Sequence, residues 1–241
     1  MSLNMVQLAF EASSLYDWAR RVESLSLEDA GYVVHAALRA CFGELAPQPF
    51  AVLSGASRFV NVLGYGPAED RTLLDAAREL AEPLLYRAVT ASKLLSKPMP
   101  ERFEAGRTYG FRILACPIRR GRDENGRVVE RDAFLSQVSR SPEEKIDRTA
   151  VYLDWLEGEL GRAGAAQLIK ASMVSFRLVR PRRLSRSTGR AMRLLGERPE
   201  VCFEGGLRVS DPEAFTALLR RGIGRHRAFG YGMVLLRPHQ G

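Results

Sequence analysis

The sequence lacks the features of membrane and secreted proteins. None of its apolar runs approaches the roughly 20 residues that span a bilayer, and residues 1–10 lack the basic start, long apolar middle and small-residue cleavage site of a signal peptide. We therefore expect a cytoplasmic protein that contacts no membrane.

Paired metal-ligand and disulfide patterns are also missing. The three cysteines, at positions 41, 116 and 202, are scattered singly, which is typical of small buried side chains in a reducing compartment. No HxxxH or HExxH pattern links the three histidines, His35, His226 and His239. We therefore expect neither a bound metal nor another cofactor.

Charge is the strongest compositional signal. The chain has 241 residues, with 36 Lys and Arg against 28 Asp and Glu, a formal charge of +8 and a pI of about 9.8. Such an excess favours a polyanionic partner, and charge alone leaves both nucleic acid and an anionic membrane open. The length and the 46% hydrophobic content suit one large domain or two small ones.

The first half is predicted to begin strand, helix, strand, strand, helix. Ser26 is a candidate helix cap and Gly43 a candidate helix end. The predicted ranges are Leu3–Phe10, Ser26–Phe42, Ala51–Ser54, Phe59–Leu63 and Ala68–Leu80.

The second half repeats this order and ends on a strand. Its predicted ranges are Thr108–Ile118, Pro142–Ala163 (begun at Ser141), Ser172–Val179, Val201–Val209, Pro212–Leu219 and Met233–Leu236. A strand–helix–strand–strand–helix–strand order is the ferredoxin-like pattern, shared with RNA-recognition domains. We therefore predict an α+β protein of tandem ferredoxin-like (RRM-like) domains, residues 1–100 and 101–241, with Pro83–Gly106 around the boundary.

The most specific motif is the glycine-rich segment Gly222–Gly232, between a predicted helix and a predicted strand. Glycine allows positive φ and close approach, so backbone N–H groups could face phosphate oxygens of RNA. The alternative is a plain connecting loop. The residues expected to contact RNA are Gly222, Gly224, Arg225, His226, Arg227, Gly230 and Gly232. A phosphate contact is the simpler role for His226, and a second proton carrier the other.

Tyr32 and His35 are three residues apart on the first predicted helix, so a phenol and an imidazole share one face. Both could reach one phosphodiester of RNA, which supplies its own 2′-OH nucleophile. Histidine has a free pKa near 6.5 and can transfer protons to or from that group. From the sequence alone, a histidine among apolar neighbours is also compatible with a simple core residue.

Arginines cluster in two further places. One cluster surrounds Arg119–Arg122 and includes Arg127 and Arg131, with a predicted hairpin turn at residues 123–126. The other runs from residue 177 to 193 and is typical of a protruding hairpin or loop against a nucleic-acid groove, with a solvated surface as the alternative. From it we select Arg180, Arg182, Arg183 and Arg186 as candidate RNA contacts.

The segment Gly222–Leu236 resembles the C-terminal signature of the CasE family of CRISPR repeat endoribonucleases. Tyr32-Val33-Val34-His35 resembles its first-helix motif. Gly205–Val209 followed by Asp211-Pro212 resembles its penultimate segment. The stretch Arg122–Arg140 is longer than the family pattern leads us to expect.

The resemblance implies a nuclease that binds the repeat hairpin of precursor CRISPR RNA and cuts at the 3′ base of the stem. It also implies metal-independent attack by the 2′-OH, 2′,3′-cyclic phosphate and 5′-OH ends, and retention on the mature RNA beside other Cascade subunits. Tyr32 and His35 would be the catalytic pair. The alternatives are a catalytically inactive Cascade subunit that binds the RNA and an unrelated tandem RNA-recognition protein. The stacked-aromatic strand motif of the latter is not visible in the sequence.

Overall fold

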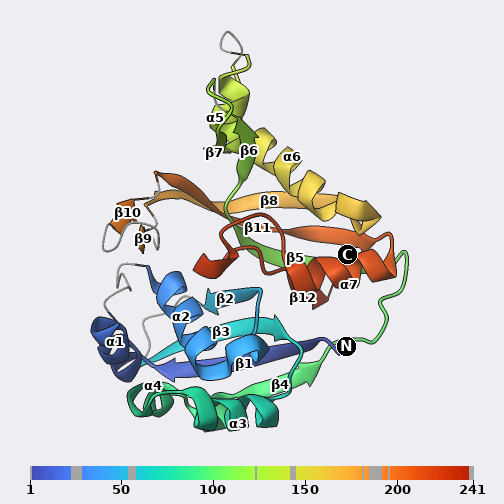
Figure 1. The fold of residues 1–241 in the computed structure, drawn as a ribbon. Helices are drawn as coiled ribbons and strands as arrows, with labels where there is room; N and C mark the ends of the chain where they lie inside the picture. The colour runs from blue at the N-terminus through green and yellow to red at the C-terminus, as the bar shows by residue number, and fades with distance from the viewer. Residues whose placement is uncertain are drawn as a thin grey trace.

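The computed structural model describes residues 2–22, 29–53, 58–122, 124–141, 145–180, 182–184, 192–194 and 196–238; for 182–184 and 192–194 it describes the backbone. The chain folds into two units, each built on a four-stranded antiparallel sheet with helices (Figure 1). The N-terminal unit is drawn in blue to green and the C-terminal unit in green to red.

The first sheet has the strand order β2-β3-β1-β4, as expected for a ferredoxin-like unit. Its strands are β1 (Asn4–Glu11), β2 (Phe50–Leu53), β3 (Phe59–Gly66) and β4 (Leu95–Pro98). The connections hold helices α1 (Ala12–Arg21), α2 (Ala30–Phe42), α3 (Asp70–Leu80) and α4 (Pro83–Ala88), and the short helices η1 (Gly43–Leu45) and η2 (Ala91–Lys93). In Figure 1, α3 and α4 lie on the side of this unit away from the second one.

The second sheet has the order β12-β5-β11-β8. From its β8 edge, this places the second, third, first and fourth strands of the unit side by side, as in the first sheet. Its strands are β5 (Thr108–Ala115), β8 (Ala166–Val179), β11 (Arg198–Val209) and β12 (Leu235–Pro238). Its helices are α5 (Ala133–Val138), α6 (Arg148–Leu160), α7 (Pro212–Arg221), η3 (Arg162–Gly164) and η4 (Arg227–Phe229). The predicted tandem ferredoxin-like fold is confirmed.

Two antiparallel hairpins extend from the second unit. One pairs β6 (Ile118–Arg122) with β7 (Val128–Asp132) and projects away from both sheets in Figure 1. The other pairs β9 (Arg182–Leu184) with β10 (Met192–Leu194), within the second arginine cluster. The first agrees with the predicted hairpin turn, and the second with the predicted protruding hairpin or loop.

Several predicted boundaries were wrong. Helix α2 begins at Ala30, because Asp29 accepts the N–H of Tyr32 and caps it; the predicted cap Ser26 lies outside the described residues. Helix α6 spans Arg148–Leu160 behind the cap Asp147, well inside the predicted range. The predicted strand over 108–118 divides into β5 and β6. The helices α1, α4 and α5 and the edge strand β4 were not predicted.

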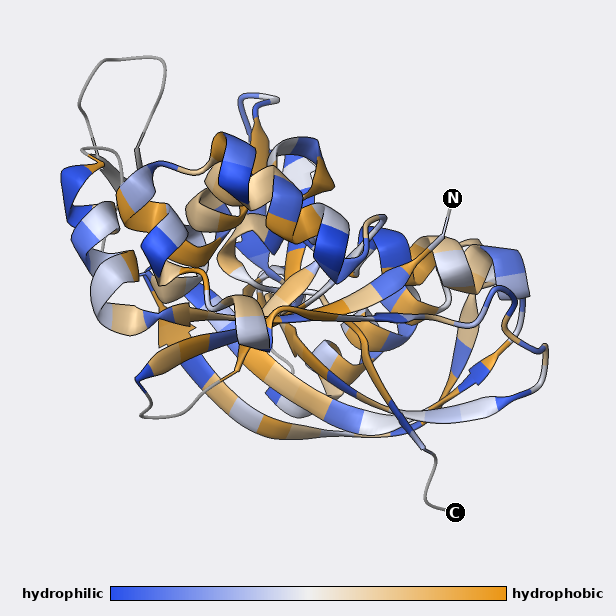
Figure 2. Cartoon of the chain, turned by 90° about the horizontal axis from the view of Figure 1, so that it is seen from below, coloured by the Kyte–Doolittle hydropathy of each residue, from blue (hydrophilic) through white to orange (hydrophobic). Residues whose placement is uncertain are grey.

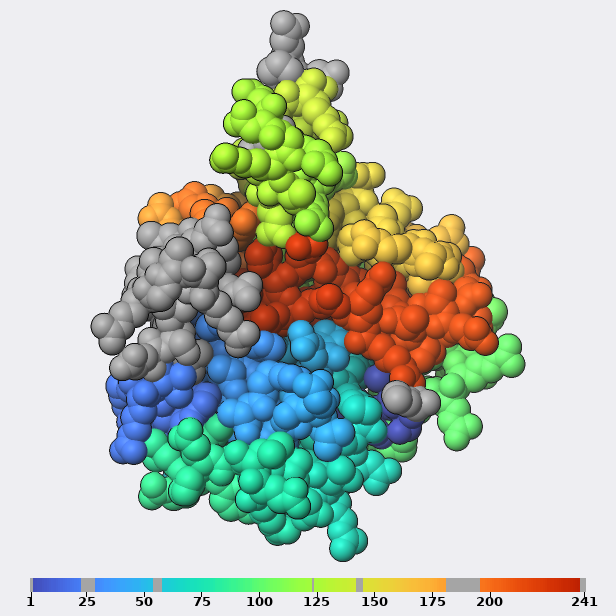
Figure 3. Space-filling view, in the orientation of Figure 1, coloured from blue at the N-terminus to red at the C-terminus, as the bar shows by residue number. Residues whose placement is uncertain are grey.

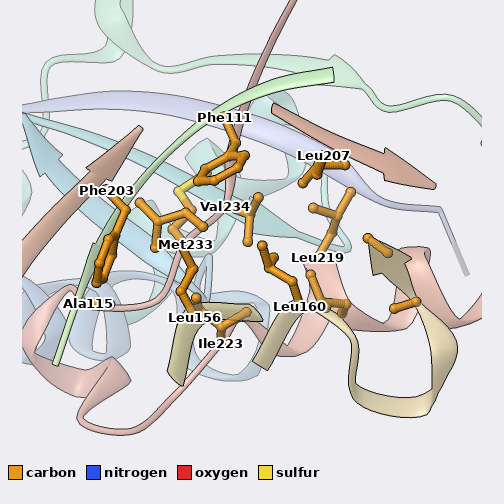
Figure 4. Close-up of a cluster of buried hydrophobic side chains, with 14 of the residues drawn as sticks. Phe111, Ala115, Leu156, Leu160, Phe203, Leu207, Leu219, Ile223, Met233 and Val234 are labelled. Carbon is orange, nitrogen blue, oxygen red and sulfur yellow. The ribbon is translucent and has the colours of Figure 1, made fainter. Parts of the chain in front are cut away.

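Each unit has its own hydrophobic core, and the two units also share contacts. The core of the first unit includes Phe10, Phe42 and Phe50, all fully buried. The core of the second unit includes the side chains that face one another in Figure 4, and it takes in Tyr65 from the first unit. The buried Tyr65 hydroxyl donates to the Val234 carbonyl at 2.9 Å. This bond joins β3 to the segment just before β12.

Surface and core residues follow the expected patterns. Blue and orange residues alternate along the helices in Figure 2, as in amphipathic elements.

The cysteines are free and buried, as predicted, and burial raises the pKa of the Cys41 and Cys116 thiols to about 12. Among the described helices, none combines the length and apolar character required to cross a membrane.

Candidate RNA-cleavage site at the junction of the two units

Helix α2 presents Tyr32 and His35 side by side. Their ring centroids are 6.3 Å apart at an interplanar angle of 30°, and both side chains are partly exposed. Asp29 caps the helix just before Ala30, and its carboxylate accepts the N–H of Tyr32 at 3.0 Å. Burial raises the pKa of Asp29, and the nearby Glu200 raises it further, while N–H groups of the helix oppose the shift.

The glycine-rich segment wraps back toward α2 rather than outward. Buried Gly222 donates its N–H to Leu218, and buried Gly230 and Gly232 donate theirs to Arg227 and Leu114. At Gly232, with φ of +84°, a Cβ would lie 2.1 Å from the Ile223 carbonyl oxygen. These three amides therefore bond to the protein, in contrast with the outward, phosphate-facing amides that the sequence suggested.

The segment has one further internal anchor. The N–H of Gly224 donates to the Glu159 carboxylate at 2.8 Å. Within the glycine-rich segment, the side chain of Arg225 is exposed. Arg227 is partly exposed and donates to the Arg221 carbonyl. Contact with RNA stays a prediction for this segment, and side chains suit that role better than the glycine amides.

The sequence analysis missed two residues that bring α2 against this loop. Phe229 in η4 stacks on Tyr32 with centroids 5.3 Å apart at 24°, and a Cβ at Gly31 would lie 2.1 Å from the Phe229 carbonyl oxygen. Only glycine permits this close approach. The position of Gly31 inside a predicted helix was the available signal for such a close contact. On the other side of the pair, His35 stacks on Phe50 at 6.4 Å and 8°.

Glu130 on β7 ties the projecting hairpin to the loop. Its carboxylate accepts from Arg225 Nε and lies 3.2 Å from His226 Nε2, and its carbonyl accepts from Arg198 at 3.1 Å. The contact with His226 lacks hydrogen-bond geometry. Burial lowers the pKa of His226, so the imidazole is neutral near pH 7, although Glu130 acts in the opposite direction.

The projecting hairpin presents arginines on both strands. Arg119 on β6 stands directly opposite Arg131 on β7, an arrangement that costs stability between like charges. Arg119 is compensated by Asp154, at 2.8 Å, while Arg120 and Arg131 are exposed. Figure 3 shows the red C-terminal segment between the blue N-terminal unit and this green projection.

Arg177 and Arg180, from the second arginine cluster, line a groove of about 1810 Å³ that runs between the two units. The junction residues Gly31 and Phe229 line the same groove. Its ion pairs join Arg180 to Glu197 at 2.7 Å and Arg177 to Glu200, which also accepts from the Tyr231 hydroxyl. These charges balance, unlike those of the hairpin. The side chains of Arg182, Arg183 and Arg186, and His239, lie outside the described residues.

Metal ligands do not cluster in the part of the chain that the structure describes: no three His, Cys, Asp or Glu residues lie close enough to hold an ion.

Comparison with known proteins gives the family. The family described as CRISPR associated protein matches residues 13–238. CRISPR-associated endoribonuclease Cse3 of Thermus thermophilus is 28% identical over 149 residues, covering 59% of this chain and 61% of that protein. The match thus spans about three fifths of the relative's length.

Solved structures match along nearly the whole chain. CRISPR endoribonuclease Cse3 bound to a 19-nucleotide RNA gives a TM-score of 0.65 at 21% identity, covering 98% of this chain and 100% of that one. A chain of a CRISPR RNA-guided surveillance complex gives 0.58 at 13% identity, with coverage of 98% and 100%. At such identities the likeness establishes the fold. With the family match, it confirms the resemblance drawn from the motifs: the chain belongs to the CRISPR associated protein family.

Proposed function

We propose that this protein is an endoribonuclease that binds the repeat hairpin of precursor CRISPR RNA and cuts it at the 3′ base of the stem. The observation that carries the proposal is the pair of Tyr32 and His35, 6.3 Å apart at the junction of the two units. Membership of the CRISPR associated protein family supports it, as does the relative named an endoribonuclease.

The proposed reaction uses the RNA's own ribose. The 2′-oxygen attacks the adjacent phosphorus and loses its proton, while the bond to the 5′-oxygen breaks and that oxygen gains a proton. The products are a 2′,3′-cyclic phosphate and a 5′-hydroxyl, and no metal is required. His35 acts as general acid or base, and Tyr32 orients or stabilises the phosphate.

RNA binding is assigned to the basic surface of the second unit. The exposed Arg120 and Arg131 of the β6–β7 hairpin and Arg225 of the glycine-rich segment lie on elements joined by Glu130. Their charge suits phosphate contacts along a duplex stem. Such a surface would position the stem while α2 acts at its base.

The protein is further proposed to stay on its product. Retention on the mature CRISPR RNA would make it a subunit of Cascade, in the cytoplasm, beside other subunits. The similar fold of a chain in an RNA-guided surveillance complex supports this role.

A cleavage assay in EDTA tests the proposal. The substrate is end-labelled repeat RNA, with a matched RNA carrying one 2′-deoxy nucleotide before the stem-base cut. We expect the first to be cut in EDTA and the second to remain intact. Tight binding of both without any product would instead favour a catalytically inactive subunit that binds the RNA. Cutting of the deoxy substrate would contradict 2′-OH attack.

A further inference from the structure

A small third hydrophobic cluster lies at the junction, apart from the two main cores. Its buried members are Cys116, Ile118, Phe229 and Tyr231, and Tyr32 packs against it half-buried. They come from the start of the β6–β7 hairpin, from the C-terminal loop and from α2. The cluster therefore joins the part of the chain proposed to bind RNA to the helix proposed to cut it.

Phe229 is the member that faces the tyrosine. The two rings are stacked, and Phe229 is 8% exposed, so its ring is held from several sides. Its N–H donates to the His226 carbonyl at 2.8 Å, which fixes the backbone. The close approach at Gly31 fixes the distance between the loop and α2.

Tyr32 itself is partly exposed and lies at the edge of the cluster. A partly exposed phenol can populate more than one rotamer unless a neighbour restrains it. The flat face of Phe229 supplies that restraint on one side, and His35 lies on the same helix face one turn along.

We propose that Phe229 is a positioning residue that holds the Tyr32 phenol in its place for RNA cleavage. The inference rests on the proposed function. Phe229 acts through Tyr32 and does not itself contact the reacting phosphate. Loss of the flat ring should therefore slow the chemical step while leaving RNA affinity unchanged.

The first test replaces the ring by a branched aliphatic side chain. Phe229→Leu should slow single-turnover cleavage at saturating enzyme by roughly two- to tenfold, the value of one aromatic pair, with an unchanged Kd for the repeat RNA. Phe229→Tyr, which keeps the ring, should restore the rate. Cleavage by Phe229→Leu at the wild-type rate would overturn the proposal.

Phe103→Leu provides the matched control. Phe103 is also buried, at 2% exposed against 8% for Phe229, and packs edge-on against Phe215 in the core of the second unit. It should lose thermal stability like any core truncation but cut at the wild-type rate. An equal loss of rate in both variants would show a general effect of destabilisation and would overturn the positioning role.

A double substitution shows whether Phe229 acts through Tyr32. In a Tyr32→Ala background, Phe229→Leu should have no further effect on the rate, because the group that it positions is gone. The same fractional loss in both backgrounds would mean that Phe229 acts by another route.

An activity-independent measurement separates this inference from the proposed function. The chain has 7 tyrosines, and in protein labelled with fluorotyrosine the ¹⁹F resonance missing from Tyr32→Phe identifies residue 32. Phe229→Leu should shift or broaden that resonance, whereas Phe103→Leu should not. If the resonance shifts but the protein never cuts RNA, the restraint of Tyr32 by Phe229 is supported and the proposed nuclease activity is rejected. An unmoved resonance would reject the restraint even in an active nuclease.

Discussion

The two units share one topology but differ sharply in charge. Residues 1–100 contain 9 Lys and Arg against 11 Asp and Glu, whereas residues 101–241 contain 27 against 17. The strand orders of their sheets correspond strand by strand. The shared topology therefore leaves charge to the connections: the arginines of the β6–β7 hairpin and the Tyr32–His35 pair both lie outside the two main sheets. Under the proposed function, this arrangement assigns RNA affinity to one unit and cleavage chemistry to the other.

The decisive connections are equivalent in the two units. Between its first and second strands, the N-terminal unit places α1 and α2, with Tyr32 and His35. At the same place, the C-terminal unit carries the β6–β7 hairpin and α6. The two connections meet at the cluster around Phe229.

The largest effect is expected from His35→Ala in the N-terminal unit. Loss of general acid–base catalysis should slow cleavage by roughly 10² to 10⁴, with an unchanged Kd for the repeat RNA. Single-turnover cleavage and filter binding measure the two quantities. If the variant cuts at full rate, the catalytic assignment is wrong.

The arginines of the hairpin should show the reverse behaviour. Arg120→Gln with Arg131→Gln should weaken RNA binding more than about tenfold at 0.1 M salt and lower the slope of log K against log salt by roughly 2. The cleavage rate of bound RNA should not change.

The matched control is Arg71→Gln with Arg87→Gln, which removes two exposed arginines from α3 and α4 of the N-terminal unit. It should leave the affinity and the salt slope nearly unchanged. Equal losses in both double variants would mean that total charge, rather than its place in the second unit, governs binding.

Gly31→Ala tests the junction itself. The added Cβ would meet the Phe229 carbonyl oxygen, so we expect a loss of about 1–3 kcal/mol in the free energy of unfolding and slower cleavage. Gly158→Ala in α6 is the control, since open space surrounds that position. It should stabilise the protein by about 0.5–1 kcal/mol. A Gly31→Ala variant as stable as wild type would show that the two units can separate without cost.

The smallest effect concerns the cap of α2. The pKa of Asp29 is raised in the folded state, mainly by burial, so its contribution is present below the ordinary value of 3.8 and is lost as pH rises through the folded pKa. Asp29→Asn keeps the capping oxygen without the charge. In urea unfolding, its stability advantage over wild type should grow between about pH 4 and about pH 7. An advantage that shrinks over this range would contradict the burial of the charge.

Elements with complete local signals were predicted well, and those without them were missed. Strands β1, β3 and β11 show apolar runs bounded by turn residues, and α7 begins at Asp211-Pro212, with Asp211 as its cap. Strand β4, Leu95–Pro98, is short, exposed and at the sheet edge, so its sequence carries no alternating apolar pattern. Helix α1 follows β1 without a break, and Glu11 caps it in place of the usual Ser or Asp.

The candidate site was only partly accessible to sequence reasoning. The spacing of Tyr32 and His35 placed both on one helix face because the helical period is local. The roles of Gly31, Phe229 and Glu130 depend on residues nearly 200 or 100 positions away along the chain, so no local pattern could reveal them. The arginines of the Arg177–Arg193 run looked equivalent to those of the hairpin, yet Arg177 and Arg180 are paired with carboxylates of the β11 region.

The tandem ferredoxin-like order, the positive charge of the second unit and the face shared by Tyr32 and His35 could be predicted without coordinates, since each follows from periodicity or composition. The surfaces that meet depend on tertiary packing. In the folded chain the amides of the glycine-rich loop turn inward, Phe229 packs on Tyr32, and Glu130 ties the hairpin to the loop. Those contacts join segments distant in sequence, and packing between the two units, rather than local propensity, determines them.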